Sequence, residues 1–224
     1  MRKGEEKRLQ LLDAAEKLFC QQGYDKTSVQ DIIGVTGVSK GGFYHHFTGK
    51  DQMLAELCAR RAERSAAYTA EALRMASNPM ERINAVLHGF TPLRREETEF
   101  MTVMLPVITK AEGRGMAVIY QEALEKDFLP LLKAEIAAAT NAQIVFPVAK
   151  EMESVILSTV NHAWMSIATA MAAARERGVR LEPTAYLAQL EKYRRAIEVL
   201  LDAPYGSIEI LRVEELEEIS RIIA

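Results

Sequence analysis

The chain has 224 residues with 28 basic and 31 acidic side chains, which gives a formal net charge of −3 at pH 7. A hydrophobic share of 49% and a charged share of 26% are typical of a globular protein and exclude a disordered, collagen-like or fibrous chain. The total charge indicates no nucleic-acid partner, but it can hide a local patch. Residues 1–50 hold eight basic and six acidic side chains, so this segment is weakly positive and favours an anionic partner.

Apolar residues recur at helical spacing through most of the chain, and strand patterns are nearly absent, so an all-α fold is predicted. The first helix runs through Leu9 and Phe19 and ends at Gly23. Thr27 or Ser28 is expected to cap a short second helix. The apolar residues expected to form one small core with the next helix are Val29, Ile32, Ile33, Val35, Val38, Phe43 and Phe47.

After a tight turn at Gly37, Ser39 is expected to cap a third short helix that ends near His46. A long fourth helix follows, from residue 50 to about 76. The later helices are predicted over residues 79–90, 96–110, 114–139, 149–177 and 183–202, with Pro130 expected to kink or split the third of these. The tail 207–224 can form a last helix, whose acidic run Glu214–Glu218 is interpreted as a solvated face.

The two cysteines, Cys20 and Cys58, show no CxxC or Cys/His spacing, so the sequence predicts no metal site and no cofactor. The charged start of the chain leads into an amphipathic segment rather than the apolar core of a signal peptide. Apolar stretches are expected to be interrupted by charge well short of the roughly 20 residues that a membrane span needs. We therefore expect a cytoplasmic protein with reduced thiols and no membrane contact.

The most informative segment, residues 27–47, has the pattern helix, glycine turn, helix. Its outward positions include Lys40, Tyr44 and His45, and Lys50 follows just beyond it. Cationic, aromatic and hydrogen-bonding side chains of this kind suit contacts with DNA phosphates and base edges. Gly41 and Gly42 cost about 1 kcal/mol each relative to alanine inside a helix, and close backbone approach to a bulky partner is one reason for them.

The run Val-Ser-Lys-Gly-Gly-Phe-Tyr-His-His-Phe at residues 38–47, with Lys50, resembles the DNA-binding domain of the TetR (tetracycline repressor) family. The resemblance covers about residues 8–60. It departs from the family pattern at Ile33, where a small residue is usual, and at Gly34, where a helix-favouring one is usual. The resemblance implies that DNA is contacted by Thr27, Ser28, Ser39, Lys40, Gly41, Gly42, Tyr44, His45, His46 and Lys50.

Three of these roles have plainer alternatives. Tyr44 can pack over the small core instead of facing DNA, and Lys50 can be an ordinary solvated charge. His45 and His46 are adjacent, so they make a poor metal-binding pair, and we expect at least one of them to be structural.

The family resemblance also implies a domain plan: a three-helix helix-turn-helix DNA-binding domain over residues 1–50, a connecting helix over 51–76 and a larger helical ligand-binding and dimerisation domain over 77–224. The segment 149–177 is apolar around most of its circumference. We expect it to join 183–202 in a homodimer interface of four helices; burial within one subunit is the alternative.

A pocket for a small-molecule effector is expected between the long helices. The residues predicted to line it are His88, Phe100, Met104, Tyr120, Phe128, Asn161, His162 and Trp164, for which plain core packing is the alternative. The sequence contains no catalytic motif of the common kinds. The predicted function is a homodimeric repressor that binds a palindromic operator and releases it with ligand; a small helical enzyme and a protein-binding adaptor are the alternatives.

Overall fold

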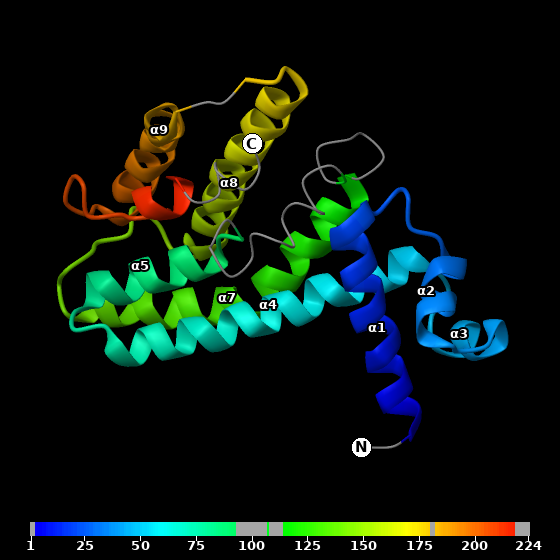
Figure 1. Cartoon of the computed structure of the whole chain (residues 1–224). Helices are drawn as coiled ribbons and strands as arrows, with labels where there is room; N and C mark the ends of the chain where they lie inside the picture. The colour runs from blue at the N-terminus through cyan, green and yellow to red at the C-terminus, as the bar shows by residue number, and fades with distance from the viewer. Residues whose placement is uncertain (1–2, 93–106, 108–113, 180–181, 218–224) are drawn as a thin grey trace.

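The computed structural model describes residues 3–92, 107, 114–179 and 182–217, and all the regular structure in these ranges is helical (Figure 1). The all-α prediction is therefore confirmed. The predicted helix 96–110 lies outside the described residues, except for Val107.

The first four helices follow the predicted boundaries closely. They are α1 (Lys3–Gln22), α2 (Val29–Thr36), α3 (Lys40–His46) and α4 (Lys50–Met75). Gly37 ends α2 with φ of +65°, a left-handed conformation that glycine adopts at little cost. Local turn and capping signals thus place the two short helices.

The small core of these helices contains Ile32, Phe43 and Phe47, all fully buried, together with Phe19 of α1. Val29, Ile33 and Val38 are partly buried against it. The prediction was wrong for Val35, which is 65% exposed although Ile32, three residues before it, is fully buried. Gly34 is also exposed and would meet no atom if it carried a Cβ, so this departure leaves the packing undisturbed.

The body consists of α5 (Pro79–Phe90), α7 (Arg114–Asn141), α8 (Glu153–Glu176) and α9 (Pro183–Leu201). The prediction placed the start of α8 four residues too early, since Glu151 has φ of +59°, which is incompatible with a helix. Pro130 does not split α7, although the helix changes direction along its course (Figure 1). Buried residues from all these helices and from α1 to α4 form one connected core.

The long helix α4 joins the two parts of the molecule, since it packs on α1 near its start and on α5 and α7 along the rest (Figure 1). Its contact with α5 is very close at Gly89, where a Cβ would lie 1.8 Å from Oγ1 of Thr69. The Ser65 hydroxyl donates to the Gly89 carbonyl over 2.6 Å.

Cys58 lies on the buried face of α4. Burial raises the pKa of its thiol to about 12, although the Arg61 guanidinium opposes this shift.

The described part of the C-terminal tail, residues 207–217, packs along α5 and α9. The Asn84 side chain donates to the Ser207 carbonyl and accepts from the Glu209 N–H, at 2.8 and 3.0 Å. Further along, a ring nitrogen of His88 lies 2.7 Å from a carboxylate oxygen of Glu215. The interpretation of the acidic run as a solvated face was therefore wrong for Glu215.

The expectation that charged residues interrupt every apolar stretch well short of a membrane span was wrong for one helix. Residues 154–174 contain no Asp, Glu, Lys or Arg, so Glu153–Ala174 in α8 is long and apolar enough to cross a membrane by length and composition. Just under half of this window is buried inside the protein, and the core helix of a soluble protein has the same composition.

The His88–Glu215 contact predicts a pH-dependent contribution to stability. Burial alone would raise the pKa of Glu215, but hydrogen bonds from His88 and the Arg212 N–H hold that pKa below its ordinary value. The carboxylate therefore stabilises the fold at neutral pH, and this contribution is lost as the pH falls through the lowered pKa.

We expect Glu215→Gln to lower the free energy of unfolding in urea by about 1–2 kcal/mol at pH 7, with the difference from the parent shrinking below about pH 4. Glu214→Gln, at the exposed neighbouring position, is the control and should have little effect. A Glu215→Gln effect that is equal at pH 7 and pH 3.5 contradicts the role of the carboxylate.

Candidate nucleic-acid interface

The two short helices are fixed by serine caps. The Ser28 hydroxyl accepts from the Asp31 N–H over 3.2 Å, and the Asp31 carboxylate accepts from the Ser28 N–H over 2.8 Å, which is a complete capping box. The hydrogen bond from the Ser28 hydroxyl, followed by that from its N–H, lowers the pKa of Asp31. Ser39 caps α3 by accepting from the Gly42 N–H over 3.1 Å.

The exposed side of α3 carries Lys40, Gly41, Tyr44 and His45. Lys40 and Tyr44 are four residues apart, as are Gly41 and His45, so each pair lies on one side of the helix. The two pairs are neighbours on the helix surface. The Tyr44 ring is 51% exposed, while its inner side contacts the Phe43 ring with centroids 5.3 Å apart. Tyr44 thus packs on the core and also presents its outer face to solvent.

The two glycines of α3 differ in their surroundings. A Cβ on Gly41 would meet nothing within 4 Å, whereas one on Gly42 would lie 3.0 Å from Val38 and 3.2 Å from Ser39. The missing side chain at Gly42 thus keeps the capped turn compact. At Gly41 the missing side chain leaves open surface.

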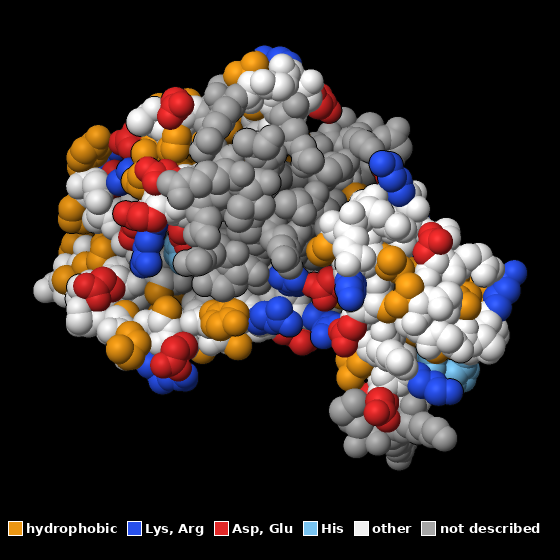
Figure 2. Space-filling view, in the orientation of Figure 1, with side chains coloured by type: hydrophobic (Ala, Val, Ile, Leu, Met, Phe, Trp, Pro, Cys, Tyr) orange, Lys and Arg blue, Asp and Glu red, His pale blue; other side chains and the backbone are white. Residues whose placement is uncertain are grey.

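The adjacent histidines contact each other, with ring centroids 5.1 Å apart. His45 is exposed and His46 is half-buried beside α1. Among the described residues, no group of three or more His, Cys, Asp or Glu side chains is placed to hold a metal ion. Figure 2 places histidine side chains beside a basic side chain at the end of the molecule that carries α3 and the start of α1.

Lys50 and Thr27 have structural partners. The Lys50 ammonium donates to the carbonyls of Tyr24 and Thr27, at 2.9 and 3.2 Å, and lies 4.2 Å from the centre of the Tyr24 ring. Thr27 is only 1% exposed, and its hydroxyl donates to the Gly23 carbonyl over 2.8 Å. The side chain of Thr27 therefore faces inward in this structure, and the cap of α2 is Ser28.

Sequence reasoning gave no role to Asp51, which accepts a hydrogen bond from the Tyr24 hydroxyl. Burial, and then this hydrogen bond, raise the pKa of Tyr24. Tyr24 lies 27 residues before Asp51, so no local sequence pattern links the two side chains. Ion pairs between α1 and α4 complete the attachment: Arg8 with Glu56, Asp13 with Arg60 and Glu16 with Arg61.

Residues 11–57 match the model of the N-terminal domain described as bacterial regulatory proteins, tetR family. This segment is therefore similar to the N-terminal domain of TetR-family regulators. The matched segment contains the capped helices α2 and α3 and the start of α4, so this similarity rests on the same residues as the geometry above. This family is one of regulatory proteins rather than enzymes.

Among the similar proteins, the HTH-type transcriptional repressor Rv1474c of Mycobacterium tuberculosis is 39% identical over 61 residues, which are 27% of this chain and 33% of that protein. The HTH-type transcriptional activator FasR of Mycolicibacterium smegmatis is 30% identical over 86 residues, 38% of this chain and 39% of that one. The alignments thus span little more than a third of these relatives. The solved structure of RolR with resorcinol matches with a TM-score of 0.58 at 12% identity, covering 98% of this chain and 95% of that one, which shows a shared fold.

Four of the residues predicted to line a ligand pocket lie on α7 and α8. Tyr120, Phe128 and Trp164 are at most 2% exposed. Asn161 donates to the Gln121 side chain and accepts from the Trp164 indole N–H, both over 2.9 Å. Asn161 and Gln121 are partly buried and form a polar bridge between α7 and α8 beside these aromatic side chains.

The other predicted pocket residues are placed differently. His162 is exposed, and its ring nitrogen lies 2.8 Å from the Ser158 carbonyl, so it does not join the interior residues. His88 faces Glu215 of the tail instead. Phe100 and Met104 lie outside the described residues. Gln121, which the sequence analysis passed over, is the polar partner that connects α7 to Asn161.

Lys50→Met tests the attachment of the first domain. Methionine keeps the apolar stem but removes both hydrogen bonds to the carbonyls of Tyr24 and Thr27, so we expect the free energy of unfolding to fall by about 1–3 kcal/mol. The measurement is urea denaturation followed by circular dichroism. Lys26→Met is the matched control, because Lys26 is exposed in the loop that contains Tyr24 and Thr27. Equal stability of the two variants contradicts the attachment.

Proposed function

We propose that this chain is a transcriptional regulator that binds a palindromic operator in double-stranded DNA as a homodimer and releases it when a small molecule binds. In this proposal the chain is a cytoplasmic repressor. Residues 1–50 bind DNA, residues 77–224 form the effector and dimerisation domain, and the helix over residues 51–76 connects the two. The observation that carries the proposal is the exposed face of α3, formed by Lys40, Gly41, Tyr44 and His45 on a rigidly capped helix-turn-helix.

The N-terminal part of a recognition helix enters the major groove in this type of domain. Lys40 is then placed for a base edge, and Tyr44, His45 and His46 for phosphates or bases, with Ser28 and Ser39 beside them. Gly41 lets the backbone approach the groove. An ammonium group has three donors, and Lys50 uses two on carbonyls, so the third is available for a phosphate. For Thr27 we propose positioning of the loop rather than a side-chain contact.

The proposed dimer is formed by α8 and α9, which pack side by side and are joined by a hydrogen bond from Gln189 to Ser166. Each helix leaves an apolar residue on its outer face: Val155 is 43% exposed and Val199 is 52% exposed. Two copies of this helix pair make a four-helix interface with two-fold symmetry, which matches the symmetry of a palindromic operator.

The proposed effector site is the interior around Asn161 and Trp164. A polar bridge among aromatic side chains suits a small aromatic ligand with hydrogen-bonding groups, and the structural similarity to RolR, solved with resorcinol, supports this class. Release requires that the ligand bind the DNA-incompetent arrangement more tightly than the competent one. The helix α4, which contacts both parts, is the proposed route between them.

DNA binding is tested by fluorescence anisotropy with a duplex that the parent protein selects from a random-sequence library. Lys40→Ala is expected to weaken binding by about 1–3 kcal/mol and to relax the sequence preference. Gly41→Ala is expected to weaken binding while leaving the fold as stable or more stable by up to about 1 kcal/mol. Lys133→Ala, on the exposed side of α7, is the control, and a parent that selects no duplex contradicts the proposed function.

The dimer is tested by sedimentation velocity at micromolar concentration, where the parent should sediment with twice its chain mass of 25.0 kDa. Val199→Glu places a charge in the proposed interface and should shift the boundary toward the monomer. Val118→Glu on α7, where the valine is equally 52% exposed, is the matched control. A parent that remains monomeric, or equal shifts in both variants, contradicts the proposed interface.

A further inference from the structure

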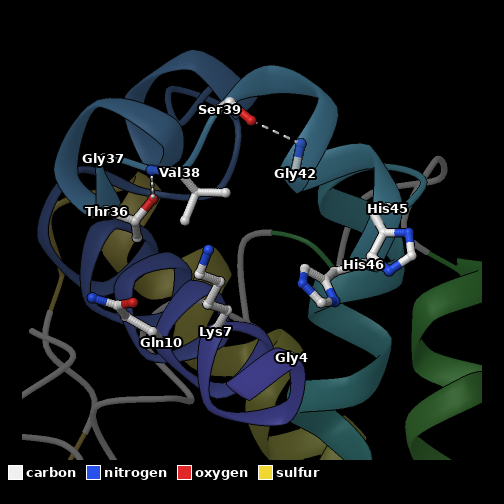
Figure 3. Close-up of a pocket in the computed structure, with 10 residues that line it drawn as sticks. All are labelled: Gly4, Lys7, Gln10, Thr36, Gly37, Val38, Ser39, Gly42, His45 and His46. Atoms are coloured by element: carbon white, nitrogen blue, oxygen red, sulfur yellow. Dashed lines mark hydrogen bonds between the residues drawn. The ribbon is translucent and has the colours of Figure 1, made fainter. Parts of the chain in front are cut away.

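A groove of about 520 Å³ separates the first half of α1 from the helix-turn-helix. Its walls include Lys7 and Gln10 of α1, Ser39 of the turn, and Gly42, His45 and His46 of α3 (Figure 3). Among the residues that the structure describes, no acidic side chain lines it. The groove thus gathers side chains that donate hydrogen bonds or carry positive charge, directly beside the exposed face of α3.

Lys7 lies in this groove without a protein partner. Its ammonium points from α1 toward the turn at Val38 (Figure 3), and it makes no hydrogen bond or ion pair within the part of the chain that the structure describes. The next residue, Arg8, is bound instead to Glu56 of α4, and its guanidinium lies 4.8 Å from the centre of the Phe47 ring. Because neighbouring side chains on a helix are about 100° apart, the attachment of Arg8 to α4 directs Lys7 into the groove.

Glycines line the groove on both sides. Gly4 sits on the α1 side, where a Cβ would lie 4.0 Å from the His46 ring, and Gly42 presents only its backbone on the α3 side. The groove therefore gives an incoming anionic group access to the Lys7 ammonium, the Ser39 hydroxyl and the two imidazoles.

We infer that α1 makes a DNA contact of its own, in which Lys7 binds a backbone phosphate seated in this groove next to α3. The inference rests on the proposed function and adds a contact outside the helix-turn-helix segment. Charge complementarity decides the ligand class, since a groove with a free ammonium and no carboxylate attracts a phosphate, and the adjacent recognition face brings the DNA backbone there. A phosphate contact fixes the position of the protein on the duplex and carries no sequence information.

The salt dependence of binding measures this contact. Each neutralised phosphate contributes about −0.9 to the slope of log K against log salt, so Lys7→Gln should reduce the slope by about 0.9 per protomer. The loss of affinity relative to the parent should then be about threefold larger per protomer at 50 mM than at 200 mM salt. The reduction should be the same on the selected duplex and on an unrelated duplex, and Lys7→Arg should retain the parent slope.

Lys17→Gln is the matched control, because Lys17 is exposed on the same helix and lies outside the groove. A reduced slope for Lys7→Gln alone supports the contact. Unchanged slopes in both variants, or equal reductions in both, overturn it while leaving the proposed function intact. Failure of the parent to bind any duplex overturns the proposed function, and the contact with it.

Discussion

The attachment of the first domain to α4 is the constraint on which the rest of the structure depends. The Lys50 ammonium holds the carbonyls of Tyr24 and Thr27 against the first turn of α4, and Asp51 binds the Tyr24 hydroxyl beside it. The loop between α1 and α2 therefore cannot shift independently of α4. Ion pairs such as Arg60 with Asp13 attach α4 to α1 as well. We therefore expect the helix-turn-helix to move together with the start of α4.

The other end of α4 is held as firmly. The Arg82 side chain donates to the Leu73 carbonyl and makes two hydrogen bonds to the Glu135 carboxylate, which joins α4, α5 and α7. The Glu135 carboxylate raises the pKa of Arg82. The close contact at Gly89 leaves no space for a side chain there between α4 and α5. In the proposed mechanism, a rearrangement around α7 and α8 would reach α3 through a displacement of α4.

The parts of this fold that were predictable from sequence are those set by local chemistry. Ser39, Gly37 and Pro79 act on the backbone within a few residues, so the boundaries of α2, α3 and α5 followed from the sequence. The start of α8 was missed because Glu151 adopts a left-handed conformation without glycine. Local pattern alone gave the order of the helices, but not how they pack.

Side-chain roles that depend on distant partners were not predictable in the same way. The contact of His88 with Glu215 joins residues 127 positions apart, and the partners of Lys50 lie 23 and 26 residues before it. Within the candidate site, the exposed positions of α3 followed from helical spacing. The inward orientation of the Thr27 hydroxyl depends on the loop at Gly23, and the groove beside Lys7 depends on how α1 lies across α3, which no spacing rule encodes.

The burial of Cys58 has a practical consequence for observing the motion of α4. The thiol is fully buried and its pKa is about 12, so at neutral pH it is almost entirely in the unreactive protonated form. Alkylation must wait until α4 separates from the core, and the labelling rate then counts those openings. Because Cys20 is also free and is only partly buried, the labelling of Cys58 must be followed separately, and its rate then reports the opening of α4.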